Sequence, residues 1–460
     1  MGHSTIVEEK FVFTQEAKKK IFWLLGAGVI MFVFGLFMAQ RGGHDDHAGG
    51  HGHVATEQLV ASADAAAASE GAEEGEHHGS ATWVKRLYTT LWMNNIYFVG
   101  LGIIGLFFVA IQYAAQAGWS SGIKRIPLAM GHWILVAFAV TVVLWFVTNH
   151  DIFHWTHSSL YGEYVDEAKT QPNPGYDEII DGKAPYFFWP GKAGGFPIFY
   201  IARMIIFFGM WYWFFLMIKK NMLAEDLEAD TKYWFKNRSI SAWFLVFFAV
   251  SSSVAAWDWV MSIDTHWFST MFGWYVFASW WVTALAMITL IVVYLKDAGY
   301  LKVVNANHLH DLGKFVFAFS IFWTYIWFGQ FLLIYYANIP EETVYFIERM
   351  KTSPYSWIFY TNLILNFVLP FLLLMTRDAK RHLSMLKVVC PIVIVGHWFD
   401  FYNMVTPGVM QNNGGLGFLE IGTGLIFMAA FLWITLNSLS KMPLFGKNHP
   451  LLEESLHHHI

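Results

Sequence analysis

The stretch "AWFLVFFAVSSSVAAWDWVMSIDTHW", residues 242–267, joins a long apolar run to two aspartates. With its flanks, the run has the roughly 20 residues that a helix needs to cross a bilayer. Asp258 and Asp264 follow among tryptophans, and tryptophan is enriched where a membrane helix meets water. The stretch therefore predicts a membrane-spanning helix that ends close to Asp258.

The composition extends this reading to the whole chain. Of the 460 residues, 56% are hydrophobic and 14% are charged, whereas a soluble domain carries about 25% charged residues. Cys390 is the single cysteine, which excludes a disulfide scaffold and an iron–sulfur cluster ligated by the cysteines of this chain alone. The sequence contains no C-x-x-C-H motif, so a covalently attached c-type haem is also excluded.

Ten apolar segments predict ten membrane-spanning helices, because lipid cannot satisfy free backbone polar groups and a helix satisfies its own. Most of the 29 Lys and Arg residues precede the first segment, follow the last, or lie in every second loop. Basic residues concentrate on the cytoplasmic side, so we expect an all-α integral membrane protein with both termini in the cytoplasm. The expected limits of the helices are 21–40, 92–115, 127–149, 197–219, 240–261, 269–295, 313–336, 354–376, 386–405 and 416–438.

Two long segments are expected on the outer side. Residues 41–91 contain "GGHDDHAGGHGH" and "ASADAAAASEGAEEGEHHGS", and such small, acidic, histidine-rich stretches cannot bury a core. We expect this segment to be flexible, although its histidines could hold a metal ion loosely. Residues 150–196 are rich in proline and glycine, which predicts an ordered loop without long helices.

Histidines are also grouped at two other places. "NHDIFHWTH" puts His150, His154 and His157 at i, i+4 and i+7 if the third helix continues, so the three would share one face. That spacing suits either a metal or haem-facing site or ordinary surface histidines. The C-terminal "SLHHHI" fits a native end or a tag.

Depth in the membrane singles out His397 and Asp400. His397 lies ten residues after Lys387, which is about 15 Å at a helical rise of 1.5 Å per residue and close to the bilayer midplane. Asp400 follows at i+3 on the same helical face. An ionisable group at this depth is a functional candidate, so the pair predicts either a proton relay or a static hydrogen-bonded contact between helices.

The other ionisable candidates are shallower. Asp258 lies twenty residues after Arg238, which is about 30 Å and therefore the outer membrane surface; a relay role and a capping role are both open for it. His132 is roughly 10 Å from Arg125 along its helix. Arg203 and Glu420 lie toward the outer ends of their helices. Neutral polar residues that could join helices or line half-channels are Gln112, Ser251 to Ser253, Thr283, Gln330, Asn362 and Asn366.

Two long stretches resemble a known membrane-protein family. "SVAAWDWVMSIDTHWFSTMFGWY" (253–275) and "HLHDLGKFVFAFSIFWTYIWFGQFLLIYYANIPEETVYF" (308–346), together with the ten-span layout, resemble the F subunit of bacterial alternative complex III, a polysulfide-reductase-type (NrfD-like) membrane subunit. The resemblance covers residues 85 to 440, approximately, and excludes the histidine-rich segment. That complex is a quinol:cytochrome c (or quinol:oxidase) oxidoreductase of the bacterial cytoplasmic (inner) membrane.

The resemblance implies an architecture. Spans two to five and six to nine would form two four-helix bundles flanked by spans one and ten. The expected division of the chain is a cytoplasmic N-terminus with the first span (1–40), a periplasmic segment (41–91), a first bundle (92–261) with its periplasmic loop, a second bundle (262–405), and the last span with a cytoplasmic C-terminus (406–460).

The resemblance also implies partners and roles. Expected partners are a homologous membrane C subunit, an iron–sulfur subunit, multihaem and monohaem cytochrome c subunits, a small membrane subunit, in some complexes a terminal oxidase, and lipids, but not nucleic acid. The partners would carry the c-type haem and iron–sulfur clusters, and this chain would bind no cofactor unless it meets a quinone or quinol. Its role would be to conduct protons while its partners oxidise quinol. The relay positions would be His132 and Asp258 in the first bundle and His397 and Asp400 in the second, with Arg203 and Glu420 completing the pathway.

Three alternatives to proton conduction stay open. In the first, Asp258, Asp264, His266 and Glu420 form a second quinone site on the outer face, since a quinol site needs a base in an apolar cleft near the surface. In the second, the chain is a structural scaffold for the other subunits. In the third, it is a secondary transporter, although matching pairs of interrupted helices, the usual sign of one, are not evident.

Overall fold

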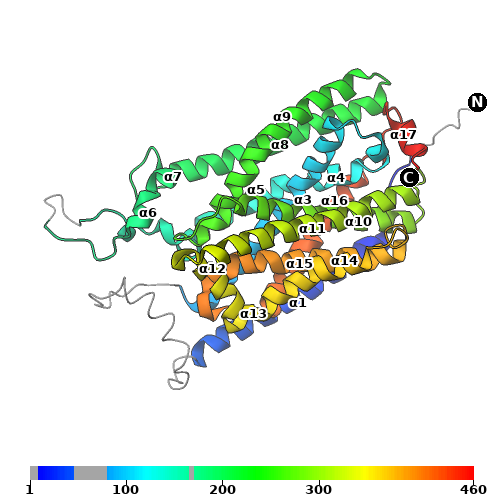
Figure 1. Ribbon diagram of the computed structural model, residues 1–460. Helices are drawn as coiled ribbons and strands as arrows, with labels where there is room; N and C mark the ends of the chain where they lie inside the picture. Colours follow the sequence, from blue (N-terminus) through cyan, green and yellow to red (C-terminus); the bar gives the residue numbers. More distant parts are fainter. Residues whose placement is uncertain (1–8, 46–79, 165–169, 460) are drawn as a thin grey trace, which may run out of the picture.

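The computed structural model describes residues 9–45, 80–164 and 170–459, and within these residues every regular element is a helix. Ten helices of this part are long and apolar enough to cross a membrane, and they run side by side along the length of the molecule (Figure 1). The prediction of a multi-pass, all-helical membrane protein with ten spans is therefore confirmed. Most of the histidine-rich segment, residues 46–79, lies outside the described residues.

The spans are formed by single helices or by short helices in series. The first five spans are α1 (Gln15–Asp45), α3 (Thr82–Ala114), α4 with α5 (Arg125–Met130 and Trp133–Ile152), α8 (Ile198–Leu227) and α9 (Lys232–Trp259). The last five are α10 (Phe272–Asp297), α11 (Ala306–Ala337), α13 with α14 (Ser353–Leu363 and Leu369–Leu373), α15 (Leu383–Met410) and α16 (Phe418–Leu439). The shorter helices are α6 (Glu178–Gly182), α7 (Ala184–Phe188), α12 (Pro340–Lys351) and α17 (Leu452–Leu456).

Several helices start well before their expected limits, among them α3, α9 and α11. The second span begins at Thr82, not at 92, so residues 82–91 are helical and continue into the expected second span. Arg86 in this added part forms an ion pair with Glu420 at 2.6 Å, which offsets the cost of a charge near the membrane. Helix α11 begins at Ala306 because the Asn305 side chain accepts a hydrogen bond from the backbone N–H of Asn307 at 2.8 Å, as an N-cap residue does.

Helices α3 and α10 form the centre of the molecule. In each, 89% of the most apolar window is buried within the protein, against 17% for α1. They contact one another closely at Gly100, where an added Cβ atom would lie 1.8 Å from the Trp280 ring. The Trp280 indole N–H donates to the Ile96 carbonyl at 3.1 Å. A helix buried on all sides is mostly apolar on all sides, as both sequences are, and the buried Asn95 amide of α3 donates a hydrogen bond to the Thr141 hydroxyl at 2.7 Å.

Most of the other spans fall into two groups, one that contains α3 and one that contains α10. Helices α3, α5, α8 and α9 contact one another and form the first helix set, to which α4 belongs as the start of the α5 span. Helices α10, α11, α13/α14 and α15 likewise contact one another and form the second helix set. Helices α1 and α16 pack along each other, and α16 packs on α3.

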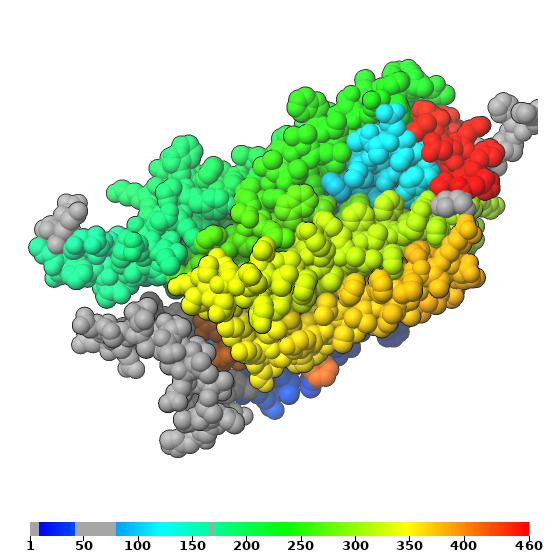
Figure 2. All heavy atoms as spheres, in the orientation of Figure 1, coloured from blue at the N-terminus to red at the C-terminus, as the bar shows by residue number. Residues whose placement is uncertain are grey.

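The two ends of the molecule differ. The end that carries the start of α1, the end of α16 and α17 is called here the termini end, and the end with α6, α7 and α12 is the loop end (Figure 1). Residues 441–459 fold back over the termini end, where the Leu444 N–H donates to the Glu9 carbonyl at 2.8 Å and α17 packs on residues 118–122. In Figure 2 this segment (red) lies directly against the cyan surface that includes those residues.

Candidate functional site

The Asp400 carboxylate lies at the centre of the second helix set. It is fully buried on α15, and one donor from each of the three other helices of the set reaches it. The Tyr275 hydroxyl on α10 donates to Oδ1, the Asn362 amide on α13 donates to Oδ1 at 2.8 Å, and the Trp323 indole on α11 donates to Oδ2 at 2.8 Å. All three donors are neutral, so no cation bonds to this carboxylate among the described residues.

His397 lies one helical turn from Asp400, as the i+3 spacing predicts. Its Nδ1 is 3.8 Å from Asp400 Oδ2, which is too long for a hydrogen bond, and the same nitrogen lies 3.0 Å from the Ser279 hydroxyl. The other ring nitrogen, Nε2, is buried and has no hydrogen-bond partner among the described residues. The expected direct contact is therefore a close approach, with Nε2 left able to bind a water or a proton.

A chain of amides continues from Asp400 along the eighth span. The Asn362 carbonyl oxygen accepts from the Asn366 amide at 2.5 Å, and Asn366 lies in a π-helical turn, Ile364–Val368, between α13 and α14. Such turns are rare and occur frequently at functional sites. Gly396 of α15 makes room for this turn, because a Cβ atom there would lie 2.2 Å from Asn366 Oδ1.

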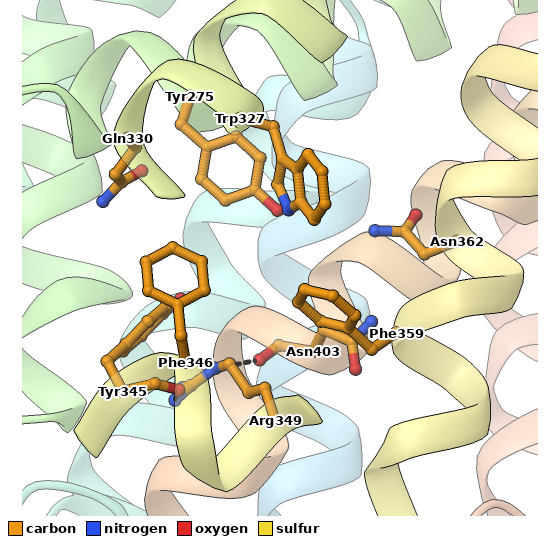
Figure 3. Close-up of a pocket in the computed structure, with 9 residues that line it drawn as sticks. All are labelled: Tyr275, Trp327, Gln330, Tyr345, Phe346, Arg349, Phe359, Asn362 and Asn403. Carbon is orange, nitrogen blue, oxygen red and sulfur yellow. Dashed lines mark hydrogen bonds between the residues drawn. The ribbon is translucent and has the colours of Figure 1, made fainter. Parts of the chain in front are cut away.

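A small cavity leads from the Asp400 cluster toward the loop end. Tyr275 and Asn362 form its inner wall, and Arg349 and Asn403 form its outer wall (Figure 3). Both side-chain polar atoms of Asn403 and the Nε2 amide of Gln330 lack hydrogen-bond partners among the described residues. A buried polar group without a partner is normally satisfied by water, so this cavity suits a water-mediated connection.

Arg349 of α12 closes the outer wall of the cavity. Its side chain is 2% exposed and donates to Asp264 at 2.9 Å and to the Asn403 carbonyl at 2.7 Å, and the Tyr345 ring covers the guanidinium at 3.5 Å. Asp264 comes from the loop after α9, as the sequence predicts. The arginine that binds it was not predicted, because "EETVYFIERMK" reads as a polar surface helix.

Asp258 is buried at the loop end of the first helix set. Arg203 of α8 binds both of its carboxylate oxygens, at 2.8 and 2.9 Å. The third guanidinium nitrogen donates to the Tyr186 carbonyl of α7 at 2.7 Å. Asp258 lies one residue before the end of α9 and is 0% exposed. The first aspartate of the stretch 242–267 is therefore held in a buried ion pair with Arg203.

The remaining candidate residues have separate partners. Glu420 binds Arg86 and also accepts from the Gly417 N–H at 2.7 Å, and His266 binds Asp177 at 2.6 Å. His132 lies near the termini end, where its Nε2 is 2.8 Å from Lys219 Nζ.

The four residues proposed for an outer quinone site, Asp258, Asp264, His266 and Glu420, are thus held by four different partners. His150, His154 and His157 would share a helical face only if the third helix continued through His157, and this condition is not met because α5 ends at Ile152.

No family model matches this chain, and no curated protein matches it.

Proposed function

We propose that this chain is a proton-conducting membrane subunit of a respiratory quinol:electron-acceptor oxidoreductase of the alternative complex III type. Asp400 and His397 would carry the proton through the second helix set. The observation that supports this most directly is the set of bonds at Asp400. Asp258 and Glu420 are each held by an arginine, whereas Asp400 is held by neutral donors.

This difference bears on proton transfer. Protonating a carboxylate that is paired with a buried arginine leaves an uncompensated buried charge, which costs several kcal/mol. Protonating Asp400 leaves no such charge, because its donors are two side-chain N–H groups and a hydroxyl. His397 Nε2 is unpartnered among the described residues, and the small cavity with its unpartnered Asn403 and Gln330 side chains extends toward the loop end. These features support a route in which Asp400 exchanges a proton with water in the cavity.

The orientation follows from charge. The termini end would face the cytoplasm of a bacterium and the loop end the periplasm, because the basic residues concentrate at the termini end. The first and second helix sets would be the two four-helix bundles that the resemblance implies, with α1 and α16 flanking them. The contacts within each set support that division.

The partners follow from the same proposal. A homologous membrane subunit, an iron–sulfur subunit and c-type cytochrome subunits would carry the electrons from quinol. This chain, without a redox centre of its own, would couple the released energy to proton movement.

Proton release per quinol oxidised, measured with the whole complex in sealed vesicles, tests the proposal. We expect Asp400→Asn to lower this ratio while the variant complex keeps its haem and iron–sulfur content. Asp297→Asn is the matched control, since Asp297 is an exposed carboxylate paired with Lys387. An unchanged ratio with normal turnover in Asp400→Asn would refute the proposal, and loss of assembly without any change in ratio would support the scaffold alternative.

One observation favours a second quinone site as an additional function. An open groove lies at the loop end between α1, α3 and α16, lined by Trp83, Arg86 and Phe418 among others. It offers an apolar wall beside the Arg86–Glu420 pair, close to the membrane surface. A photoreactive quinone that labels Trp83 or Phe418 would support it, whereas labelling confined to the partner subunits would exclude it.

A further inference from the structure

A second cluster of buried ionisable side chains lies at the termini end of the first helix set. Lys124 and Arg125 stand at the start of α4, and Glu225 and Asp226 stand near the end of α8. His449 reaches them from the C-terminal segment. Lys124 is 1% exposed, Glu225 is 2% exposed and His449 is 6% exposed. Charged groups are almost never this buried unless they are paired.

Only part of the cluster is paired. Arg125 binds Asp226 at 2.6 Å. Among the described residues, by contrast, Lys124 Nζ has no carboxylate within ion-pair distance; its neighbours are His449 Nε2 at 3.4 Å and the Tyr113 ring at 4.3 Å. Glu225 Oε1 is buried and has no hydrogen-bond partner in the described part of the chain. An amine and a carboxyl group are thus buried in one cluster, near enough for their charges to interact but without an ion pair between them among the described residues.

The hydrogen bonds of His449 indicate the protonation state of Lys124. The Leu451 backbone N–H donates to His449 Nδ1 at 3.2 Å, so in the neutral ring the proton is on Nε2. That N–H group then faces Lys124 Nζ, which can accept it only as an uncharged amine. The tautomer follows here from the hydrogen-bond network.

The groups that face this cluster come from every neighbouring element. Burial lowers the pKa of Lys124 to about 7, against the opposing effect of Glu225 and of Glu454 on α17. Burial also lowers the pKa of His449, and the positive charges of Arg125 and of Lys124 in its protonated form add to that shift. Helix α3 contributes the Tyr113 hydroxyl, which lacks a partner among the described residues, and helix α9 contributes the neutral Asn237.

The C-terminal segment covers the cluster. The Asn448 side chain donates to the Glu225 and Asp226 carbonyls at 3.1 Å, and an added Cβ atom on Gly446 would lie 3.1 Å from Asp226 Oδ1. Beyond His449 the segment continues across the termini end to the second helix set, where His458 binds Asp311 at 2.6 Å. The segment is therefore fixed on both sides of the residue that covers Lys124.

We propose that Lys124 and Glu225 form a buried proton-exchange site at the termini end of the first helix set, and that His449 controls the access of water to it. The ammonium group of Lys124 passes its proton to the Glu225 carboxylate through water admitted past His449, which leaves a neutral amine and a neutral carboxylic acid, and Glu225 later releases that proton to water by the same route. The amine then regains a proton from water at the termini end. This site lies in the other helix set from Asp400 and does not depend on the function proposed for that residue.

Proton binding by the whole complex, titrated between pH 6 and 8, tests the site. We expect wild type to bind about one proton more across this range than Lys124→Met, because a group with a pKa near 7 changes its charge there. Glu225→Gln should remove one infrared band of a protonated carboxylic acid, and Asp400→Asn should leave the Lys124 titration unchanged. Equal titrations of wild type and Lys124→Met would overturn the proposal.

If Lys124→Met fails to fold, the isosteric Glu225→Gln variant tests the site instead. The role of His449 in controlling the access of water is tested separately. His449→Ala should speed hydrogen–deuterium exchange of the Glu225 carboxyl band severalfold. The control is His459→Ala, which changes an exposed histidine of the same segment. Equal exchange rates in the two histidine variants would refute the role of His449, and a Glu225 band that is absent from wild type at every pH would refute the site.

Discussion

The buried ion pair between Arg203 and Asp258 gives the sharpest test of how this fold is held together. Asp258→Asn keeps the shape of the side chain but removes its charge. Arg203, 9% exposed at the side chain, then stays buried between the Tyr186 and Phe199 rings, whose centroids lie 4.2 and 4.5 Å from it. Breaking a buried pair on one side costs about 3–5 kcal/mol, mostly because the remaining charge has no partner.

The double variant separates this cost from the value of the pair itself. Replacing both residues, as Arg203→Met with Asp258→Leu, removes both charges together, and such replacements are often neutral or stabilising. We therefore expect Asp258→Asn to lower the free energy of unfolding by about 3–5 kcal/mol and the double variant to recover most of that loss.

Reversible unfolding in mixed detergent micelles measures these free energies. Glu228→Gln is the control, because Glu228 binds Lys232 at a similar distance, 2.9 Å, but on the surface; its unfolding should not change measurably. A stable Asp258→Asn protein, or a double variant as unstable as the single one, would refute the reasoning. The first of these results would also return Asp258 to the list of groups that can change protonation state.

Three further predictions concern packing and charge. Gly396→Ala should cost about 1–3 kcal/mol by overpacking against Asn366, whereas Gly209→Ala, which faces open space, should be stabilising by about 0.5–1 kcal/mol; unfolding in micelles measures both. Arg349→Met should cost about 3–5 kcal/mol because Asp264 and the Asn403 carbonyl lose their donor, and a melting temperature equal to that of wild type would contradict this. Lys124 has a folded pKa of about 7 against an ordinary value of 10.5, so the unfolded state binds more protons between these values and stability rises with pH across them. Lys124→Met should abolish that rise in the free energy of unfolding. At pH 6 the variant should be more stable than wild type by a few kcal/mol, at roughly 1.4 kcal/mol per pKa unit. This difference should vanish near pH 10.5.

Much of the fold could be predicted from hydropathy and from the rise per residue of an α-helix. The ten spans follow from apolar length, and the depth of His397 and Asp400 follows from counting residues after Lys387. Depth fixes one coordinate only, however. That Tyr275, Trp323 and Asn362 surround Asp400 depends on the rotation of each helix about its axis, and helices that are apolar on every face give no periodic signal for that rotation.

The arginines were harder to predict than the carboxylates. Arg349 lies in a charged helix that reads as solvent-exposed, and Arg203 lies near a helix end where arginine often extends to the surface. Both turn inward because an aspartate on a neighbouring segment is there to bind them. The Lys124–Glu225 cluster is similar, since "AEDLEAD" reads as an exposed linker and is covered only once the C-terminal segment folds back over it.

The contact between the two helix sets bears on whether they act together. At this contact the Tyr97 hydroxyl donates to the Ile394 carbonyl at 2.7 Å and the Trp280 indole donates to the Ile96 carbonyl. A backbone carbonyl accepts a hydrogen bond but has no proton to pass on, so these bonds do not form a relay from one set to the other. If protons move through both sets, as we propose, neither of these two bonds joins the routes.

Lys124→Met and Asp400→Asn should consequently act independently. Effects of residues that share no partners usually add to within about 0.5 kcal/mol, and these two residues lie in different sets with no partner in common. The measured quantity is proton release per quinol in the two single variants and the double variant. Additive losses would mean two routes in parallel. A double variant no worse than either single variant would mean one route through both sites, and a connection across the α3–α10 contact would then have to be found.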